Sequence, residues 1–200
     1  IEFEKVLKKE KPDWVVVLGD VNATCACSIT AKKEHIRVAH IEAGLRSRDM
    51  DMPEEINRLV TDRLSDLLFT PDRLSNANLR AEGVPASKIK FVGNIMIDTL
   101  ERERAKAARL DLNSIITSNL ATPTPTTYAS LAEGKYIAMT MHRPSNVVRK
   151  EVLKPLIGFI VDEVAAKMPV VWAIHPRARK RLEEFGLWKK VANCKNMILV

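Results

Sequence analysis

HIEAGLRSRDMDMPEEINR, from His40 to Arg58, is the most informative stretch of this chain. A short apolar run ends at Ile41, Glu42 follows it at once, and Gly44 marks a turn. Pro53 then opens a segment with two acids in its first turn, a combination that is favourable at a helix start. The pattern predicts a strand, a polar loop and a helix, with acids at the strand exit and the helix start. Two such carboxylates can converge on one cleft and act as general acid and base.

The flanking sequence repeats this alternation of strands and helices. Continuous apolar runs predict strands at residues 14–18, 38–41, 66–70, 90–92, 136–141 and 170–174. Helices are expected at residues 23–33, 53–64, 74–82, 95–110 and 150–167, and a loop or a short helix and loop at 112–134. The alternation predicts an α/β fold with parallel sheets, in two units joined near residue 100. The run from Trp14 to Leu18 is typical of a strand buried on both faces.

The composition narrows the class of protein. The chain has 200 residues, of which 46% are apolar, enough to bury the core of one domain or parts of two. No run reaches the roughly 18 apolar residues of a membrane span, and the charged start IEFEKVLKKE lacks the apolar core of a signal peptide. We therefore expect a cytoplasmic protein. Three cysteines (Cys25, Cys27 and Cys194) predict reduced thiols rather than a disulfide framework or a zinc site.

The net charge of +7 is unevenly distributed. Residues 1–100 carry a net charge of −1 and residues 101–200 a net charge of +8. A basic second half can attract nucleic acid or a phosphorylated small molecule, but a solvated helix face explains a cluster such as RARKR at 177–181 equally well. Aromatic residues make up only 5% of the chain and do not interleave with the cations, which argues against binding of single-stranded nucleic acid.

Polar residues follow the predicted strands at five places: Asp20, Glu42, Asn94, His142 and His175. Ligands of open parallel sheets bind beyond the carboxyl ends of the strands. Any one of these residues has an ordinary interpretation as a loop cap, whereas five in succession favour a site. The chain contains no G-x-G-x-x-G, no G-x-x-x-x-G-K-[ST], no G-x-S-x-G and no H-E-x-x-H. We therefore expect carboxylate and histidine chemistry with no cofactor and no metal.

Six ordered motifs carry a family resemblance. LGDVNAT (18–24), the stretch 40–58, SDLLFTP (65–71), VGNIMID (92–98), MTMHRPSNV (139–147) and HPRARKRLEEFGL (175–187) resemble the UDP-N-acetylglucosamine 2-epimerase family. The resemblance implies two Rossmann-like domains of the glycosyltransferase-B type, both incomplete. Residues 1–100 match the C-terminal part of the first, and 101–200 the linker and the N-terminal part of the second. A Gly-Thr-Arg-Pro-Glu loop is expected before Ile1, and a Gly-rich uridine diphosphate segment after Val200.

The resemblance also implies site residues and a reaction. It implies that UDP-N-acetylglucosamine (UDP-GlcNAc) and UDP-N-acetylmannosamine (UDP-ManNAc) are interconverted by elimination and re-addition of UDP, for cell-surface polysaccharide precursors. The implied catalytic residues are Asp20, Glu42, Glu54 and His142, and the implied substrate-binding residues are Arg58, Arg143 and His175. Arg58 has the alternative of an i,i+4 ion pair with Glu54, and Glu55 is expected to be only a helix-start acid. A homodimer is implied for the full-length protein.

Several alternatives stay open. HRPSN (142–146) replaces the HRREN often found in the family, so a related UDP-diacetamido-glucuronate, or hydrolysis to the free sugar, is also compatible with the resemblance. A further alternative is an inactive module that binds a nucleotide sugar. A nucleic-acid-binding protein that uses the basic second half is the least favoured alternative. Neither nucleic acid nor a membrane is expected as a partner.

Overall fold

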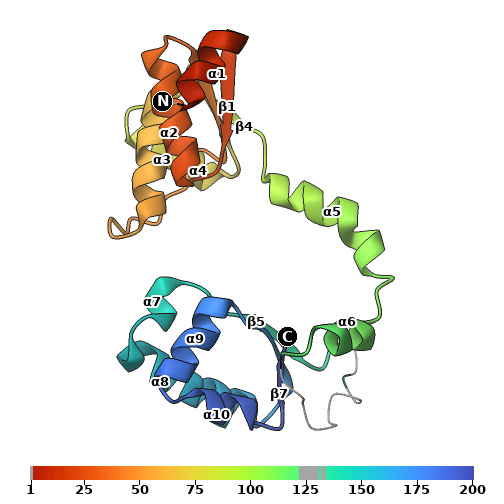
Figure 1. The fold of residues 1–200 in the computed structure, drawn as a ribbon. Helices are drawn as coiled ribbons and strands as arrows, with labels where there is room; N and C mark the ends of the chain where they lie inside the picture. Colours follow the sequence, from red (N-terminus) through yellow and green to blue (C-terminus); the bar gives the residue numbers. More distant parts are fainter. Residues whose placement is uncertain (1, 122–130, 132–133) are drawn as a thin grey trace. The chain divides into compact units, whose positions relative to one another are not determined.

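The computed structural model describes residues 2–121, 131 and 134–200. They form two compact units, Ile1–Ala105 and Lys106–Val200, and the boundary falls within helix α5 (Ile95–Ala107). Each unit contains one all-parallel sheet with helices packed on it (Figure 1). Among the described residues, no helix is both long enough and apolar enough to cross a membrane.

The first unit is built on a sheet with the strand order β1-β2-β3-β4. The strands are β1 (Trp14–Leu18), β2 (Arg37–Ile41), β3 (Leu67–Thr70) and β4 (Ile89–Phe91). The connections contain α2 (Asn22–Lys33), α3 (Pro53–Leu64), α4 (Arg73–Ala81) and the short η1 (Ala86–Lys88), and α1 (Glu2–Glu10) precedes β1. Leu18 is in register with Ile41, so the loops after β1 and β2 leave the same edge of the sheet.

Among the described residues, strand β1 is covered on one face, whereas the sequence pattern predicts that both of its faces are covered. Val15 and Val17 pack in a core cluster with Leu7 of α1 and Ala31 of α2. On the other face, Val16 is 61% exposed and Leu18 is 53% exposed. A strand made entirely of apolar residues has the same local pattern whether one or both of its faces are covered, so the sequence cannot distinguish the two cases.

The second unit has a three-stranded sheet in the order β5-β6-β7. Its strands are β5 (Ile137–Thr140), β6 (Val170–Ala173) and β7 (Met197–Leu199). Its helices are α6 (Leu112–Asn119), α7 (Pro144–Val147), α8 (Lys150–Phe159), the π-helical turn η3 (Ile160–Val164), α9 (Pro176–Glu184) and α10 (Trp188–Ala192). Trp172 of β6 is fully buried in a core with Leu153, Ile157 and Leu182, which fastens α8 and α9 to the sheet.

Most predicted elements are present, with shifts of a few residues at their ends. The predicted helix at 150–167 ends as an α-helix at Phe159 and continues as the η3 turn to Val164. The region 112–134 begins with α6, while the predicted loop at 122–130 and 132–133 lies outside the described residues. The sequence did not predict bounds for α1, α7, α9, α10 or β7. The elements α7, α10 and β7 are short, and α1 and α9 are mostly charged, which masks the helical spacing of Phe3, Val6 and Leu7 in α1.

Gly44→Ala is expected to destabilise the protein more than Gly83→Ala. Both glycines have a positive φ, 82° and 80°, so an L-residue costs roughly 1–2 kcal/mol at either position. A Cβ at Gly44 would also lie 2.6 Å from the carbonyl oxygen of Ser75, whereas one at Gly83 has no neighbour within 4 Å. This clash adds about 1–3 kcal/mol. Urea unfolding of both variants measures the difference, and equal losses would contradict the packing at Gly44.

Candidate active site

Asp20 and Glu42 lie on neighbouring loops at the carboxyl edge of the first sheet. The Gly19 N–H donates to the Ile41 carbonyl at 3.1 Å, which joins the two loops where the strands end. Glu42 adopts a positive φ of 70°, a conformation that costs energy in a residue other than glycine. Its carboxylate lies beside Gly19, where its Oε2 is 3.5 Å from the position a Cβ would take. A Cβ at that distance would be in ordinary contact, so the positive φ of 70° at Gly19, and not crowding by Glu42, favours glycine there.

The first turns of α3 hold Asp20 in place. The Asp20 carboxylate accepts a hydrogen bond from Arg58 Nη1, and its backbone carbonyl accepts one from Asn57 Nδ2 at 2.8 Å. Asn57 also donates to Asn22 Oδ1 at 3.0 Å, at the start of α2. Two consecutive residues of α3 thus bind both the main chain and the side chain of Asp20, so its orientation is restricted.

Arg58 is a buried link between two carboxylates. Its Nε and Nη2 donate to Glu55 Oε2 at 3.0 and 2.7 Å, while Nη1 contacts Asp20. The predicted alternative of an ion pair with Glu54 is wrong, because the helical partner of Arg58 is Glu55 at i,i+3. The predicted contact of Arg58 with a phosphate stays a prediction. In the structure, Arg58 anchors Asp20 to α3.

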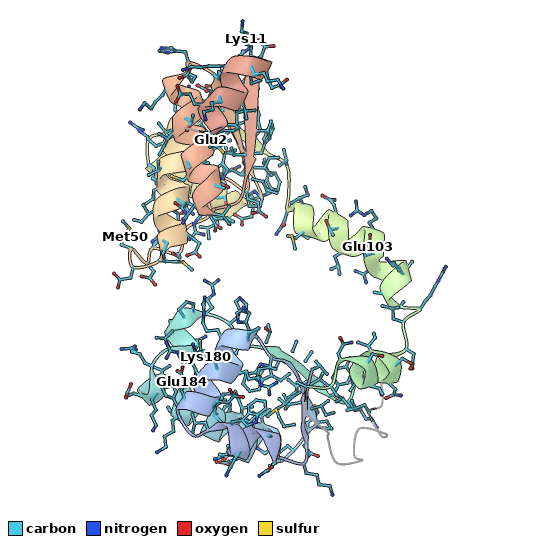
Figure 2. All side chains as sticks on the ribbon, in the orientation of Figure 1. Glu2, Lys11, Met50, Glu103, Lys180 and Glu184 are labelled. Carbon is cyan, nitrogen blue, oxygen red and sulfur yellow. The ribbon has the colours of Figure 1, made fainter. Side chains whose placement is uncertain are left out.

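Glu55 is more than the helix-start acid that the sequence predicted. Its side chain is 2% exposed and accepts hydrogen bonds from the backbone N–H groups of Ser47 and Arg48, both at 2.9 Å, and from Ser47 Oγ at 3.0 Å. Burial raises the pKa of Glu55, but the hydrogen bonds from Ser47, Arg58 and Arg48 outweigh burial and lower that pKa to about 2. Glu55 thereby folds the β2–α3 loop, which carries Met50 (Figure 2), back onto α3.

Glu54 differs from its buried neighbour. It lies in the first turn of α3, is partly exposed, and forms no hydrogen bond or ion pair with another described residue. Glu42 likewise has no such partner among the described residues. These two carboxylates are therefore open to a ligand, whereas the Glu55 carboxylate is fully occupied by the protein.

The second unit brings two histidines together at the carboxyl edge of its own sheet. His142 follows β5, His175 follows β6, and their exposed rings lie with centroids 6.3 Å apart. His175 Nδ1 accepts a hydrogen bond from the Arg177 N–H at 3.1 Å and so caps α9. Arg143 is exposed immediately before α7. Imidazole and guanidinium groups at one edge suit an anionic ligand.

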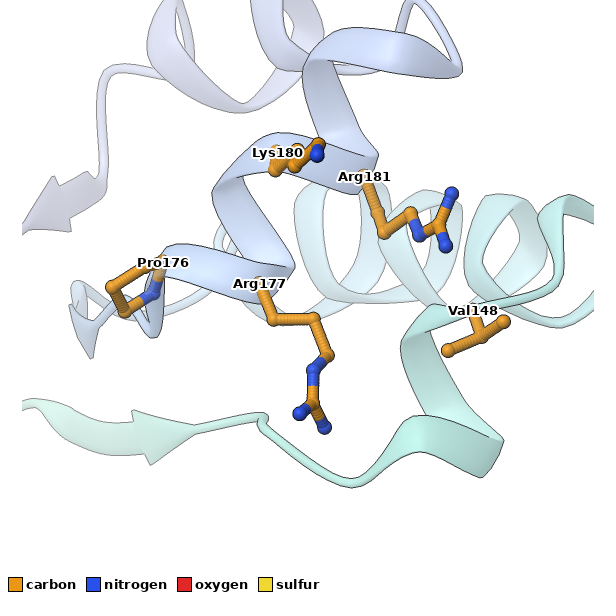
Figure 3. A pocket seen from close by; sticks show the side chains of 5 residues that line it. All are labelled: Val148, Pro176, Arg177, Lys180 and Arg181. Atoms are coloured by element: carbon orange, nitrogen blue, oxygen red, sulfur yellow. The ribbon is translucent and has the colours of Figure 1, made fainter.

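A basic cavity of about 400 Å³ lies between α7 and α9. Its walls are Val148, Pro176, Arg177, Lys180 and Arg181. Figure 3 shows Arg177 and Arg181 extending from α9 on the side of Val148. The basic cluster 177–181 was expected to face either solvent or an anionic partner, and three of its cations line this one cavity.

The whole chain resembles proteins of one known family. The family model described as UDP-N-acetylglucosamine 2-epimerase matches residues 1–200. A UDP-N-acetylglucosamine 2-epimerase of Methanocaldococcus jannaschii is 41% identical over 207 residues, which cover 100% of this chain and 52% of that protein. A UDP-2,3-diacetamido-2,3-dideoxy-D-glucuronate 2-epimerase of Pseudomonas aeruginosa is 39% identical over 94% of this chain and 49% of its own length.

Solved structures agree with the sequence comparison. The crystal structure of the Methanocaldococcus jannaschii UDP-GlcNAc 2-epimerase in complex with UDP-GlcNAc and UDP matches with a TM-score of 0.82 at 40% identity. The match covers 100% of this chain and 52% of that one, so the chain spans about half the length of the relatives it matches. The predicted α/β class, with parallel Rossmann-like sheets of the glycosyltransferase-B type, is confirmed.

Glu55→Gln is expected to lower the free energy of unfolding by about 3 kcal/mol at pH 7, because the pKa of Glu55 falls from 4.5 to about 2 on folding. A lowered carboxyl pKa stabilises the folded state above about pH 4.5, and this contribution is lost as the pH falls toward 2. The difference in unfolding free energy between wild type and variant, measured by urea unfolding, should therefore be smaller at pH 3 than at pH 7. Glu54→Gln, the matched control, should change stability by less than about 0.5 kcal/mol. A difference in unfolding free energy that does not change with pH would contradict this role of Glu55.

Proposed function

This chain belongs to the UDP-N-acetylglucosamine 2-epimerase family, and we propose that the protein inverts C2 of a UDP-amino sugar. The favoured reaction interconverts UDP-GlcNAc and UDP-ManNAc. The observation that carries the proposal is the family match over residues 1–200, together with the adjacent loops of Asp20 and Glu42 at the carboxyl edge of the first sheet. Ligands of parallel α/β sheets bind at that edge.

The chemistry explains why several carboxylates are needed. No ketone acidifies the C2 hydrogen, so we infer that a carboxylate removes it while the C1–O bond to UDP breaks, leaving a glycal with a C1=C2 double bond. UDP oxygen then re-adds to C1, and a proton reaches C2 from the opposite face. Two faces require acid and base groups at two positions. We assign these roles to Asp20, Glu42 and Glu54.

The surroundings of the three carboxylates support this assignment. Asp20 is restricted by Arg58 and Asn57, which suits a group that must keep one geometry throughout the reaction. Glu42 and Glu54 have no hydrogen-bond partner among the described residues and are open to exchange protons with a sugar. We assign Arg58 to holding Asp20, and its contact with phosphate remains a prediction.

The leaving diphosphate requires positive charge and a proton. We assign His142 to stabilising or protonating UDP as it departs, and Arg143 to a charge-assisted hydrogen bond with the diphosphate. His175 is proposed as a nucleotide-side contact, since its ring lies 6.3 Å from that of His142. The residues of the second unit thus supply anion recognition, whereas the carboxylates of the first unit supply proton transfer.

A second substrate is favoured by a specific comparison. The Pseudomonas aeruginosa relative that is 39% identical is named for a diacetamido-glucuronate sugar. The same site residues would serve that substrate, because inversion at C2 needs the same acid and base groups. Hydrolysis to the free sugar and binding without turnover are the remaining alternatives.

We also propose that the full-length protein supplies precursors of cell-surface polysaccharides, that it is located in the cytoplasm, and that it forms a homodimer.

The full-length protein is expected to interconvert UDP-GlcNAc and UDP-ManNAc and to place solvent deuterium at C2 of the product. Mass spectrometry and proton NMR in D₂O measure both results, and parallel reactions with the UDP-diacetamido-glucuronate compare the two substrates. Free amino sugar in place of the epimer would identify the hydrolysing reaction. If no UDP-amino sugar gives either exchange or UDP release, the proposed function is wrong.

Asp20→Asn, Glu42→Gln and Glu54→Gln are each expected to lower kcat at least about 100-fold, the usual contribution of a general acid or base. Glu10→Gln is the control, because Glu10 lies at the exposed end of α1 and pairs with Lys9 at the surface. Its kcat should match that of the wild type. Circular dichroism checks that each variant is folded, and a folded Glu54→Gln with full kcat would remove Glu54 from the mechanism.

A further inference from the structure

His40 is a buried histidine with an oxygen acceptor at each ring nitrogen. It lies one residue before the end of β2, its side chain is 0% exposed, and the sequence analysis gave it no role. Its Nε2 is 2.9 Å from the Gly19 carbonyl oxygen, and its Nδ1 is 2.6 Å from Asp62 Oδ1. A carbonyl oxygen can only accept, so Nε2 carries a hydrogen.

Asp62 has the surroundings of an ionised carboxylate. Its Oδ2 accepts hydrogen bonds from the Gly44 N–H at 3.0 Å and from Arg46 Nη1 at 2.8 Å. Asp62 Oδ1 lies 2.6 Å from His40 Nδ1, so the two side chains share a hydrogen bond in the core. This bond satisfies two buried polar groups that would each be costly without a partner.

The pair joins the two loops that carry candidate acid/base groups. His40 holds the carbonyl of Gly19, the residue before Asp20, and Asp62 holds the N–H of Gly44, two residues after Glu42. Asn78 Nδ2 also holds the second loop, because it donates a hydrogen bond to the Gly44 carbonyl at 2.9 Å. Because Glu42 has a positive φ, its loop needs such external hydrogen bonds to keep its conformation.

We propose that His40 and Asp62 are positioning residues that fix the separation of Asp20 and Glu42 for proton transfer at C2. Neither contacts the reacting atoms, because both are buried beneath the loops that they hold. The inference rests on the proposed epimerase reaction and deepens it. It predicts that loss of the pair lowers kcat far more than it raises KM, since the nucleotide is bound by other residues.

The test compares Asp62→Asn with Asp66→Asn in the full-length protein. Asp66 also holds β2, by accepting from the Val38 N–H at 2.9 Å and from Lys32 at 2.8 Å, but at the opposite end of the strand. Each substitution removes the negative charge of a carboxylate that forms an ion pair and is also hydrogen-bonded to a residue of β2. We expect kcat to fall about 100-fold in Asp62→Asn, with KM changed by less than about threefold, and to stay unchanged in Asp66→Asn.

His40→Gln provides a second variant in case Asp62→Asn does not fold. The glutamine amide can donate to the Gly19 oxygen but lacks the second ring nitrogen that faces Asp62, so kcat should fall less than in His40→Ala. A folded Asp62→Asn with wild-type kcat overturns the inference, as does an equal loss of kcat in Asp66→Asn. In either of these two cases the wild-type protein still turns over substrate, so only the positioning role has failed and the proposed function stands. If the wild type is itself inactive on every UDP-amino sugar, the proposed function has failed and the positioning role with it.

Discussion

The guanidinium of Arg58 is the interaction on which the first unit's site depends. It is 9% exposed and lies between the carboxylates of Glu55 and Asp20, so its charge is compensated by one buried and one partly exposed partner. Removing one partner of such a pair leaves an uncompensated charge away from water, which costs several kcal/mol. The same charge balance that stabilises α3 therefore also determines where the Asp20 carboxylate is held.

Two polar networks converge on the loop after β1. Arg58 and Asn57 hold Asp20 from α3, and His40 holds Gly19 from β2. Apolar packing alone is not directional, whereas each of these hydrogen bonds requires a particular position of its acceptor. The convergence gives a short loop between a strand and a helix one preferred geometry, which a catalytic carboxylate needs. The loop after β2 is held in the same way, by Asp62 and Asn78.

Adjacent acids have opposite roles in this arrangement. Glu54 and Glu55 are the same type of residue, and both suit a helix N-terminus. Glu55 is nevertheless buried and accepts five hydrogen bonds from Ser47, Arg48 and Arg58, whereas Glu54 forms none with a described residue. The proposed mechanism uses Glu54 and not Glu55, and the contacts of the two side chains support this choice. Glu55 is buried and its carboxylate is occupied by hydrogen bonds within the protein, whereas the Glu54 carboxylate is open to a ligand.

The amino-acid sequence was enough to predict the α/β class, the family, and the positions of the longer strands and helices to within a few residues, because apolar runs, turn residues and ordered motifs are local features of the chain. It placed Asp20, Glu42, His142 and His175 after strands for the same reason. Two features became apparent only from the packed structure: Glu55 is buried, and His40 pairs with Asp62. These outcomes depend on contacts between distant residues, such as the 38 positions that separate Arg58 from Asp20. No local pattern contains such contacts, because they exist only once the strands and helices have packed together.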